Sequence, residues 1–302
     1  MVASTKLDAT RTTKLLKRPF GVKVGKLDQS LSAWLTNMDD RLNLYQPLAL
    51  FVPNSAGDSN TLLNLTLQAV SQTFPLLNRL LETLGRAKLS PVPIEQIVTD
   101  ADAQNAAEEL KSLFTRFGSD KSTGRNYHLL YGEILKSKTK ISHVLEIGLG
   151  TNNLDVASNM GAGGMPGASL RAFREYLPNA TIFGADIDKR ILFEEARIHT
   201  HFVDQTDMAS LEALGKKLPD FIDLIVDDGL HSPNANLAVL AFALERLKNH
   251  GWLVIEDIPE RAVPFWEVVA ALLPDRFPCK LLRAEGALVF AVQRQEAPAA
   301  RH

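Results

Sequence analysis

The stretch HVLEIGLGTNN, residues His143–Asn153, decides the fold that this sequence predicts. It opens with a short apolar run that is interrupted by Glu146 and then turns on Gly148 and Gly150. An apolar run of this length suits a buried strand, and glycine readily adopts the backbone angles of a tight strand-to-helix turn. The stretch therefore predicts a strand whose last residues lead into a ligand-facing loop.

Two nucleotide-like cofactors fit such a loop, a dinucleotide or S-adenosylmethionine. The dinucleotide fingerprint has a third glycine three residues after the second, and this chain has Asn153 at that position. Glu146 precedes the first glycine by two residues, where a carboxylate would repel a pyrophosphate and attract a cationic sulfonium or amino group. We therefore favour S-adenosylmethionine, although the two-glycine loop taken alone also fits an ordinary strand turn.

The composition is that of an ordinary globular protein. The 302 residues are 45% hydrophobic and 23% charged, with a formal net charge of -2. Because nucleic-acid binding needs a concentrated positive field, this balance predicts no nucleic-acid partner. The single cysteine, Cys279, allows no disulfide within the chain, which fits a reducing compartment, and we expect a cytoplasmic protein. No apolar run reaches the roughly 20 residues that span a bilayer, so no membrane partner is expected.

Three regions are predicted along the chain. Residues 1–26 are basic and threonine-rich, lack the apolar core of a secretory signal, and are expected to form a disordered arm. Residues 27–117 carry apolar side chains at helical spacing, which predicts an auxiliary helical region in which Pro75 begins, kinks or divides a helix. Residues 118–302 contain the cofactor loop and are expected to form the cofactor-binding domain.

After Gly150 the sequence alternates between strand and helix patterns, which implies a parallel sheet with helices on both faces. The last two expected strands are separated only by Ala284–Gly286, which predicts a hairpin and one antiparallel edge. We therefore predict an α/β fold with a seven-stranded, mostly parallel, doubly wound sheet and a C-terminal antiparallel hairpin, following a mainly helical N-terminal region. The expected strands are Val144–Ile147, Thr181–Ala185, Phe202–Asp204, Asp223–Val226, Trp252–Ile255, Lys280–Leu282 and Leu288–Val292.

Ligands of open α/β sheets collect beyond the carboxyl ends of the strands, so the residues at those ends belong together. The second strand ends in GADID, where Asp186 is placed to accept hydrogen bonds from ribose hydroxyls. The third ends in VDQTD, where Asp204 and Gln205 would reach the adenine edge. The predicted cofactor contacts are Glu146, Gly148, Gly150, Asn152, Asp186, Ile187, Asp204, Gln205 and Asp227.

Carboxylates also follow the fourth and fifth strands, in VDDGLHS and VIEDIP. Neighbouring strands lie about 5 Å apart, so Asp228, Glu256 and Asp257 could meet one ion. So many strand-end carboxylates would repel one another unless cationic ligands or a metal offset them. An all-oxygen set without cysteine suits a hard cation, so we predict that these residues bind Mg²⁺, Ca²⁺ or Mn²⁺. The alternative is that Glu256 and Asp257 only cap the loop that follows.

His231 lies three residues after Asp228, beyond a glycine that lets the backbone turn sharply. A histidine beside acidic groups can titrate near neutral pH, which is the useful range for a general base. The predicted catalytic residues are therefore His231 and Asp228. Structural roles are assigned to His128, His143, His199, His201 and His250.

The motifs LEIGLGTNN, GADID, VDQTD, VDDGLHS and VIEDIP follow one another in this order, with a glycine-rich segment, GAGGMPGASLRAFREYLPNA, after the first. This series resembles the class I methyltransferases that methylate macrolide sugars with S-adenosylmethionine and a metal, the mycinamicin and macrocin type. The resemblance covers roughly residues 118–292. It implies the class I methyltransferase fold for 118–302 and an N-terminal region that assembles a homo-oligomer. It also implies that His231 is the base and that Asp228, Glu256 and Asp257 bind Mg²⁺.

Together, the residues and the resemblance predict an enzyme, an O-methyltransferase that depends on S-adenosylmethionine and a divalent metal. Its expected acceptor is a small molecule, a sugar or glycosylated natural product, whose hydroxyl the metal activates and His231 deprotonates. Two alternatives stay open: methylation of a catechol-like diol, and a non-catalytic scaffold built on the same fold. The complete set of strand-end carboxylates argues against the scaffold, because no structural need requires all of them.

Overall fold

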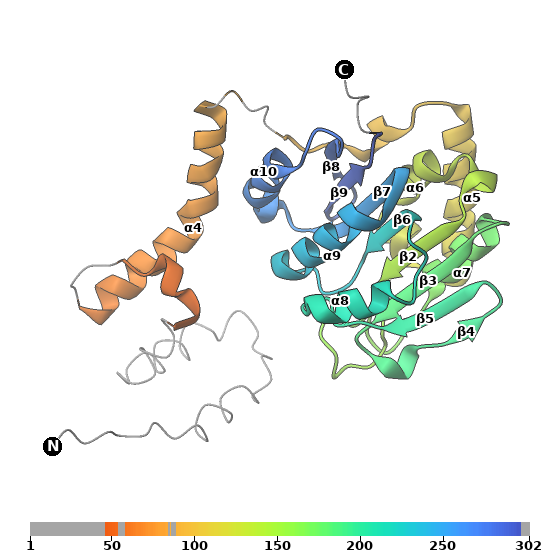
Figure 1. The fold of residues 1–302 in the computed structure, drawn as a ribbon, viewed down its shortest axis with the longest axis horizontal. Coiled ribbons are helices and arrows are strands. Elements are labelled where there is room, and N and C mark those ends of the chain that lie inside the picture. The colour runs from red at the N-terminus through yellow and green to blue at the C-terminus, as the bar shows by residue number, and fades with distance from the viewer. Residues whose placement is uncertain (1–45, 54–57, 84, 86–88, 297–302) are drawn as a thin grey trace. The chain divides into compact units, whose positions relative to one another are not determined.

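The residues that the computed structural model describes are 46–53, 58–83, 85 and 89–296 (Figure 1). The chain divides into two compact units, Met1–Thr73 and Phe74–His302. The predicted arm, 1–26, and the first expected helical segment, around Trp34, lie outside the described residues. The predicted region boundaries after residues 26 and 117 remain predictions.

The described residues before position 84 are mostly helical. A 3-10 helix, η2 (Gln46–Phe51), precedes the long helix α4 (Ser59–Thr83). The Asp58 carboxylate caps α4, because it accepts hydrogen bonds from two backbone N–H groups of the first turn at 3.0 and 3.1 Å. Pro75 lies inside α4, which continues as one helix on both sides of it. The predicted helical character of this region is confirmed over these residues.

A nine-stranded sheet forms the centre of the second unit, in the order β1-β8-β9-β7-β6-β2-β3-β5-β4 among the described residues (Figure 1). The strands are β1 (Val92–Pro93), β2 (His143–Ile147), β3 (Thr181–Asp186), β4 (Glu194–Glu195), β5 (Ile198–Phe202), β6 (Ile222–Asp227), β7 (Leu247–Ile258), β8 (Cys279–Arg283) and β9 (Leu288–Gln293). Two strands of two residues each, β1 and β4, extend the seven that were predicted. The central strands β2, β3, β5, β6 and β7 are parallel.

The C-terminal hairpin of β8 and β9 is confirmed, but its place in the sheet differs from the prediction. β9 runs antiparallel to both β7 and β8 and lies between them, so the antiparallel strand is not at an edge. The sequence signals that two strands form a hairpin, whereas it does not signal which of the two pairs with the existing sheet. The order β8-β9-β7-β6-β2-β3-β5, with its single antiparallel strand, is that of the predicted class I methyltransferase fold.

Helices cover both faces of the sheet. Successive residues of a strand point to opposite faces, and the central strands carry buried apolar side chains on both. In β2, Val144 packs into one hydrophobic cluster and Leu145 into the other. The first cluster is covered by α5 (Ala101–Phe117), α6 (His128–Leu135) and α7 (Ala168–Tyr176). The second is covered by α8 (Met208–Gly215), α9 (Pro233–Arg246) and α10 (Val263–Leu272) (Figure 1).

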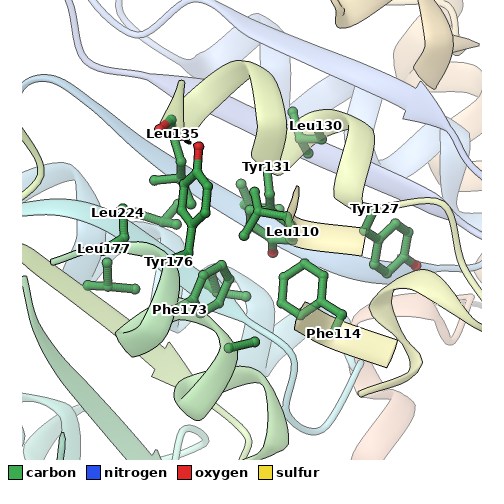
Figure 2. Packing of buried hydrophobic residues seen from close by; sticks show 14 of the residues in the cluster. Leu110, Phe114, Tyr127, Leu130, Tyr131, Leu135, Phe173, Tyr176, Leu177 and Leu224 are labelled. Carbon is green, nitrogen blue, oxygen red and sulfur yellow. Dashed lines mark hydrogen bonds between the residues drawn. The ribbon is translucent and has the colours of Figure 1, made fainter. Parts of the chain in front are cut away.

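Three aromatic rings join the helices of the first face (Figure 2). Phe114 of α5, Tyr131 of α6 and Phe173 of α7 lie edge to face, with ring centroids 5.3 to 6.1 Å apart. Such pairs add to the stabilisation that comes from burying the rings. The cluster fixes α5 and α6 against the sheet, so the segment between these two helices has two anchored ends.

The third strand of the parallel series was predicted at Phe202–Asp204 and instead occupies Ile198–Phe202. Its first residues alternate between buried Ile198 and Thr200 and more exposed histidines, so they lack the continuous apolar run used to find the other strands. The shift leaves Asp204 two residues beyond the strand, still at the carboxyl edge of the sheet.

Candidate functional site

A cavity of about 290 Å³ lies at the carboxyl ends of β2, β3, β5 and β6. This edge is where ligands bind in open parallel sheets. Its wall also contains Asp228 of the predicted metal set and the backbone of Gly229. The predicted cofactor contacts in the wall are Gly148, Gly150, Asp186, Ile187, Asp204 and Gln205.

The two glycines of the opening motif are required both by conformation and by space. Gly148 has a φ of 95° and Gly150 a φ of 75°, a region that side chains with a Cβ rarely adopt. A Cβ on Gly148 would lie 2.0 Å from the carbonyl oxygen of Asp228. A Cβ on Gly150 would lie 2.1 Å from Sδ of Met160, which packs over the loop. The loop therefore brings the β2 end into direct contact with the β6 end.

Asp186, at the end of β3, connects the glycine loop after β2 to β3 through hydrogen bonds. Its Oδ2 accepts a hydrogen bond from the backbone N–H of Leu149 at 2.7 Å, and its Oδ1 accepts one from Asp188 at 2.8 Å. Burial raises the pKa of the Asp186 carboxyl. Each carboxylate oxygen has a second lone pair, so Asp186 can still accept the ribose hydroxyls that the sequence assigned to it.

Gln205 connects the third and fourth strands of the parallel series. Its Nε2 donates to Oδ1 of Asp227 at 2.9 Å, and its Oε1 accepts from the backbone N–H of Leu230 at 2.6 Å. Asp227 is fully buried and also accepts from Nδ2 of Asn236 at 2.8 Å. Gln205 thus lines the cavity and holds the loop that carries Asp228.

Three predicted cofactor residues do not line this cavity, namely Glu146, Asn152 and Asp227. The Glu146 carboxylate is completely buried, accepts a hydrogen bond from the Ser169 hydroxyl and lies 3.1 Å from Nζ of Lys121. The charge argument made for Glu146 therefore needs correction, because its charge faces a lysine inside the protein rather than a ligand. Asn152 is exposed, and Asp227 is occupied by Gln205 and Asn236.

Lys121 lies at the centre of the acidic part of the site. Its side chain is 1% exposed, and its Nζ donates to Oδ2 of Asp228 at 2.7 Å and to Oε2 of Glu256. Burial alone would lower the pKa of this ammonium, but Asp228, Glu256 and Glu146 raise it well above its usual range. Burial raises the pKa of Glu256 against the influence of Lys121, and the hydroxyl of Tyr131 donates to that carboxylate.

Lys121 was not among the predicted site residues. The local signals that place it are readable. Gly118 ends α5 in the left-handed conformation with its N–H directed at the last turn, and Ser119 then caps a short 3-10 helix, η4 (Asp120–Ser122). These two caps fix the backbone at Lys121 relative to the end of α5. Its partners Asp228 and Glu256, however, are 107 and 135 residues away in the chain.

Asp257 occupies the end of β7 in an unusual backbone conformation. The pairing of β7 with β9 shifts register between Ile255 and Ile258, and Asp257 has a φ of 54°. A bulge re-aims side chains that would otherwise alternate, and bulges are frequent beside active sites. The Asp257 Oδ1 accepts from Nε of Arg125 at 2.9 Å and from the Tyr127 hydroxyl at 2.5 Å. Despite burial, these two donors lower the pKa of Asp257.

His231 faces both aspartates. Its Nε2 lies 3.8 Å from Oδ1 of Asp228 and 4.0 Å from Oδ2 of Asp257. Its own φ is 55°, and strained backbone of this kind concentrates at functional sites. Nδ1 of His231 is buried without a hydrogen-bond partner among the described residues. Nε2 faces Oδ1 of Asp228 and Oδ2 of Asp257, the carboxylate oxygens that Lys121 and Arg125 do not bind.

These three groups can hold a cation. One ligand atom each of Asp228, His231 and Asp257 lies within 4.8 Å of the others. The carboxyl groups of Glu146, Asp228, Glu256 and Asp257 lie here, and in the described part of the chain Lys121 and Arg125 are the lysine and arginine that form ion pairs with them. The donor chemistry and the surplus negative charge both fit a hard divalent cation. Glu256, the remaining predicted ligand, does not join this group because Lys121 and Tyr131 engage its carboxylate.

No helix within residues 46–53, 58–83, 85 and 89–296 is both long and apolar enough to cross a membrane. No family model matches the sequence.

The chain is similar to 8-demethyl-8-alpha-L-rhamnosyl tetracenomycin-C 2'-O-methyltransferase of Streptomyces olivaceus, with 29% identity over 178 residues, which are 57% of this chain and 44% of the relative. It is also similar to mycinamicin VI 2''-O-methyltransferase of Micromonospora griseorubida, with 34% identity over 93 residues, 30% of this chain and 23% of the relative. The chain thus spans less than half the length of these curated relatives. The resemblance to this group of O-methyltransferases, predicted from the motifs, is confirmed.

Among solved structures, MycE methyltransferase from the mycinamycin biosynthetic pathway, in complex with Mg, SAH and mycinamycin VI, is similar with a TM-score of 0.49 and 21% identity. That similarity covers 63% of this chain and 57% of the other.

Proposed function

We propose that this chain is an S-adenosylmethionine- and divalent-metal-dependent O-methyltransferase that acts on a hydroxyl of a sugar or glycosylated natural product. The named O-methyltransferases that it resembles support the reaction class. The observation that carries the proposal is the place of Asp228. This residue lines the cavity and also supplies an oxygen to the cluster with His231 and Asp257. A methyl donor in the cavity and a hydroxyl at the cluster would therefore meet.

On the cofactor side, the chain's task is to orient the donor. S-adenosylmethionine, when bound, supplies a methyl group on a positively charged sulfur. Asp186 would accept the ribose hydroxyls, and Asp204 and Gln205 would contact the adenine, as the sequence predicted. Gly148 and Gly150 line the cavity, so their backbone would contact the donor at the β2 end.

On the acidic side, Asp228 and Asp257 would hold the metal through the oxygens that face His231. A divalent cation bound there would lower the pKa of the acceptor hydroxyl. Glu256 was predicted as a third ligand, and in this structure its carboxylate faces Lys121. Arg125 and Tyr127 fix Asp257 by binding its other oxygen, which leaves Oδ2 directed at the cluster.

We propose that His231 takes the proton of the acceptor hydroxyl at Nε2. The nitrogen lies beside two carboxylate oxygens, which would stabilise the imidazolium once it is formed. Its side chain is 25% exposed, so a substrate hydroxyl and solvent can both reach it. The hydroxyl oxygen then attacks the methyl carbon from the side opposite the sulfur, and the chain contributes alignment and exclusion of water.

Binding calorimetry tests this proposal. We expect S-adenosylhomocysteine to bind the full chain, and Mg²⁺ to bind it with a separate heat. Absence of cofactor binding would contradict the proposal and favour the scaffold alternative, in which the fold is kept without chemistry. Cofactor binding without any heat from Mg²⁺ or Mn²⁺ would remove the metal from the proposal.

The acceptor class needs a second assay, with radiolabelled S-adenosylmethionine and Mg²⁺. We expect methyl transfer to 8-demethyl-8-alpha-L-rhamnosyl tetracenomycin C, because a relative is named for this substrate. The matched aglycone should not be methylated. Transfer to a simple catechol with none to the glycoside would contradict the sugar assignment.

Assembly and compartment are also proposals. We propose a homo-oligomer formed through the N-terminal region, and a cytoplasmic location that fits a single reduced cysteine. Light scattering on the full chain tests the first, since a monomer at micromolar concentration would contradict it.

A further inference from the structure

The Lys121 ammonium lies among the carboxylates of the acidic part of the site. It is buried to 1% exposure and touches three carboxylates, those of Glu146, Asp228 and Glu256. Its Nζ donates hydrogen bonds to Asp228 and Glu256, and it forms an ion pair with Glu146 at 3.1 Å. Lysine is almost never fully buried unless it is paired, and here one positive charge is shared by three potential negative charges.

The contacts of Lys121 also divide the oxygens of the site. Lys121 binds Oδ2 of Asp228, whereas Oδ1 of the same carboxylate faces His231. Glu256 is fully engaged, because it accepts from Lys121 and from Tyr131. The lysine thus leaves Asp228 half free and keeps Glu256 away from the cluster with Asp257.

We infer that Lys121 is an internal counter-cation, a positioning residue that keeps the acidic centre assembled without metal and competes with a divalent cation for Asp228. The inference rests on the proposed function, because the competing cation is the metal proposed above. Two consequences follow. Without Lys121 the metal-free protein should be less stable, since three buried or half-buried carboxyl groups then lack their partner. A divalent cation should bind more tightly, because a repelling positive charge beside Asp228 is gone.

The test compares Lys121→Met with the wild-type full chain in buffer with EDTA and in buffer with Mg²⁺. Methionine has a similar length and carries no charge. We expect the Tm of the variant to fall by about 5–10 °C in EDTA, and Mg²⁺ to restore more of it than it adds to the wild type. Calorimetry should show Mg²⁺ affinity at least about tenfold higher than that of the wild type. Lys138→Met, which removes an exposed lysine paired with Glu109, is the matched control and should change neither value.

A second pair of variants keeps the inference testable if Lys121→Met does not fold. Lys121→Met/Glu256→Gln removes one charge of each sign, and Glu256→Gln alone removes a negative charge. If charge governs the site, the double variant should bind Mg²⁺ about as tightly as the wild type, and Glu256→Gln more weakly. A double variant far weaker than the wild type would contradict the inference, because Glu256 would then be a metal ligand that Lys121 does not withhold.

Failure of this inference differs from failure of the proposed function. Wild-type protein that binds no divalent cation would overturn the metal part of the function. Lys121→Met that is as stable as the wild type in EDTA would overturn the role of Lys121, whatever the wild type binds. Unchanged Mg²⁺ affinity in a folded Lys121→Met would do the same.

Discussion

The two halves of the site hold their carboxylates in different ways. In the cofactor half, at the ends of β2, β3 and β5, Asp186 is fixed by backbone N–H groups of the neighbouring loop. In the acidic half, at the ends of β6 and β7, the carboxylates are bound by side chains that lie 107 to 135 residues earlier. The first half is therefore formed by loops next to the strand ends. The second half depends on side chains from the segment between α5 and α6 and from α6 itself, which pack against the ends of β6 and β7. Damage to one half should leave the other intact.

The variant His231→Ala is expected to give the largest difference between an effect on turnover and an effect on cofactor binding. Loss of the proposed general base should lower kcat by about 100-fold or more, because positioned proton transfer contributes on that order. Affinity for S-adenosylhomocysteine should stay within a factor of two of the wild type, since His231 does not line the cavity. A radiolabelled methyl-transfer assay and calorimetry measure the two quantities.

The same variant decides between two roles of His231. A base leaves Mg²⁺ affinity nearly unchanged when it is removed, whereas a metal ligand weakens it strongly. His199→Ala, at an exposed histidine on β5, is the matched control. Full turnover in His231→Ala, or a loss of Mg²⁺ affinity equal to the loss of turnover, would refute the role as base.

Gly148→Ala should break the independence of the halves, because this glycine touches both. The added Cβ meets the Asp228 carbonyl at 2.0 Å, and the φ of 95° is strained for alanine. We expect the free energy of unfolding to fall by about 2–3 kcal/mol and cofactor and Mg²⁺ affinity to fall together. Gly124→Ala is the control, since its Cβ would meet nothing within 4 Å. Wild-type affinity for both ligands in Gly148→Ala would show that the two ends do not constrain each other.

Tyr127→Phe should act on the acidic half alone. It removes the hydroxyl that donates to Oδ1 of Asp257 at 2.5 Å and leaves the ring in the core. Partners of a metal ligand typically contribute about 10-fold or more to affinity, so Mg²⁺ should bind roughly tenfold more weakly. Cofactor affinity should not change. Tyr176→Phe, whose hydroxyl makes only a 3.4 Å contact with the Leu135 carbonyl, is the control. Equal effects of the two variants would contradict the assigned role.

Asp188 offers a pH test confined to the cofactor half. Its carboxylate accepts from Arg190, Thr151 and Asn153, and these donors hold its pKa well below the usual 3.8. Because the folded-state pKa is the lower one, the stabilisation is present above about pH 4 and is lost as the pH falls toward the folded-state value. We expect Asp188→Asn to lower Tm by a few degrees at pH 7, with a smaller difference at pH 3. Asp275→Asn, at an exposed carboxylate, is the control; a gap that widens in acid would reverse the assigned sign.

The smallest effect is expected at Cys279, on β8 and outside both halves. Burial raises the pKa of its thiol to about 11. At pH 8 the folded protein should react with a disulfide reagent at least about tenfold more slowly than the unfolded chain. Addition of Mg²⁺ or S-adenosylhomocysteine should leave that rate unchanged. A reaction rate that changes when either ligand binds would show that the site is coupled to β8.

The cofactor half could be predicted from the sequence because its geometry is local. The glycine turn follows directly from a buried strand, and Asp186 lies at the end of the next strand, so the alternation of strands and helices was enough to bring them together. The hairpin of β8 and β9 was readable for the same reason, as a short turn between two apolar runs.

The partners of the acidic half could not be predicted in this way. Strand order placed Asp228 and Asp257 as neighbours, but the sequence carries no signal that Lys121 reaches Asp228 and Glu256 across more than 100 residues. The charge of Glu146 was assigned to the cofactor for the same reason. Its neutralising partner is far away in sequence, and only the packing of α5 and α6 on the sheet brings that partner close.

The central claim is that a methyl donor and a divalent cation meet at Asp228. The most direct measurement is the anomalous difference density of Mn²⁺ in crystals of the full chain grown with S-adenosylhomocysteine. We predict one peak in contact with Oδ1 of Asp228 and Oδ2 of Asp257, with the cofactor in the cavity at the ends of β2, β3, β5 and β6. Bound cofactor with no Mn²⁺ peak within coordination distance of these two aspartates, or cofactor outside that cavity, would contradict the claim.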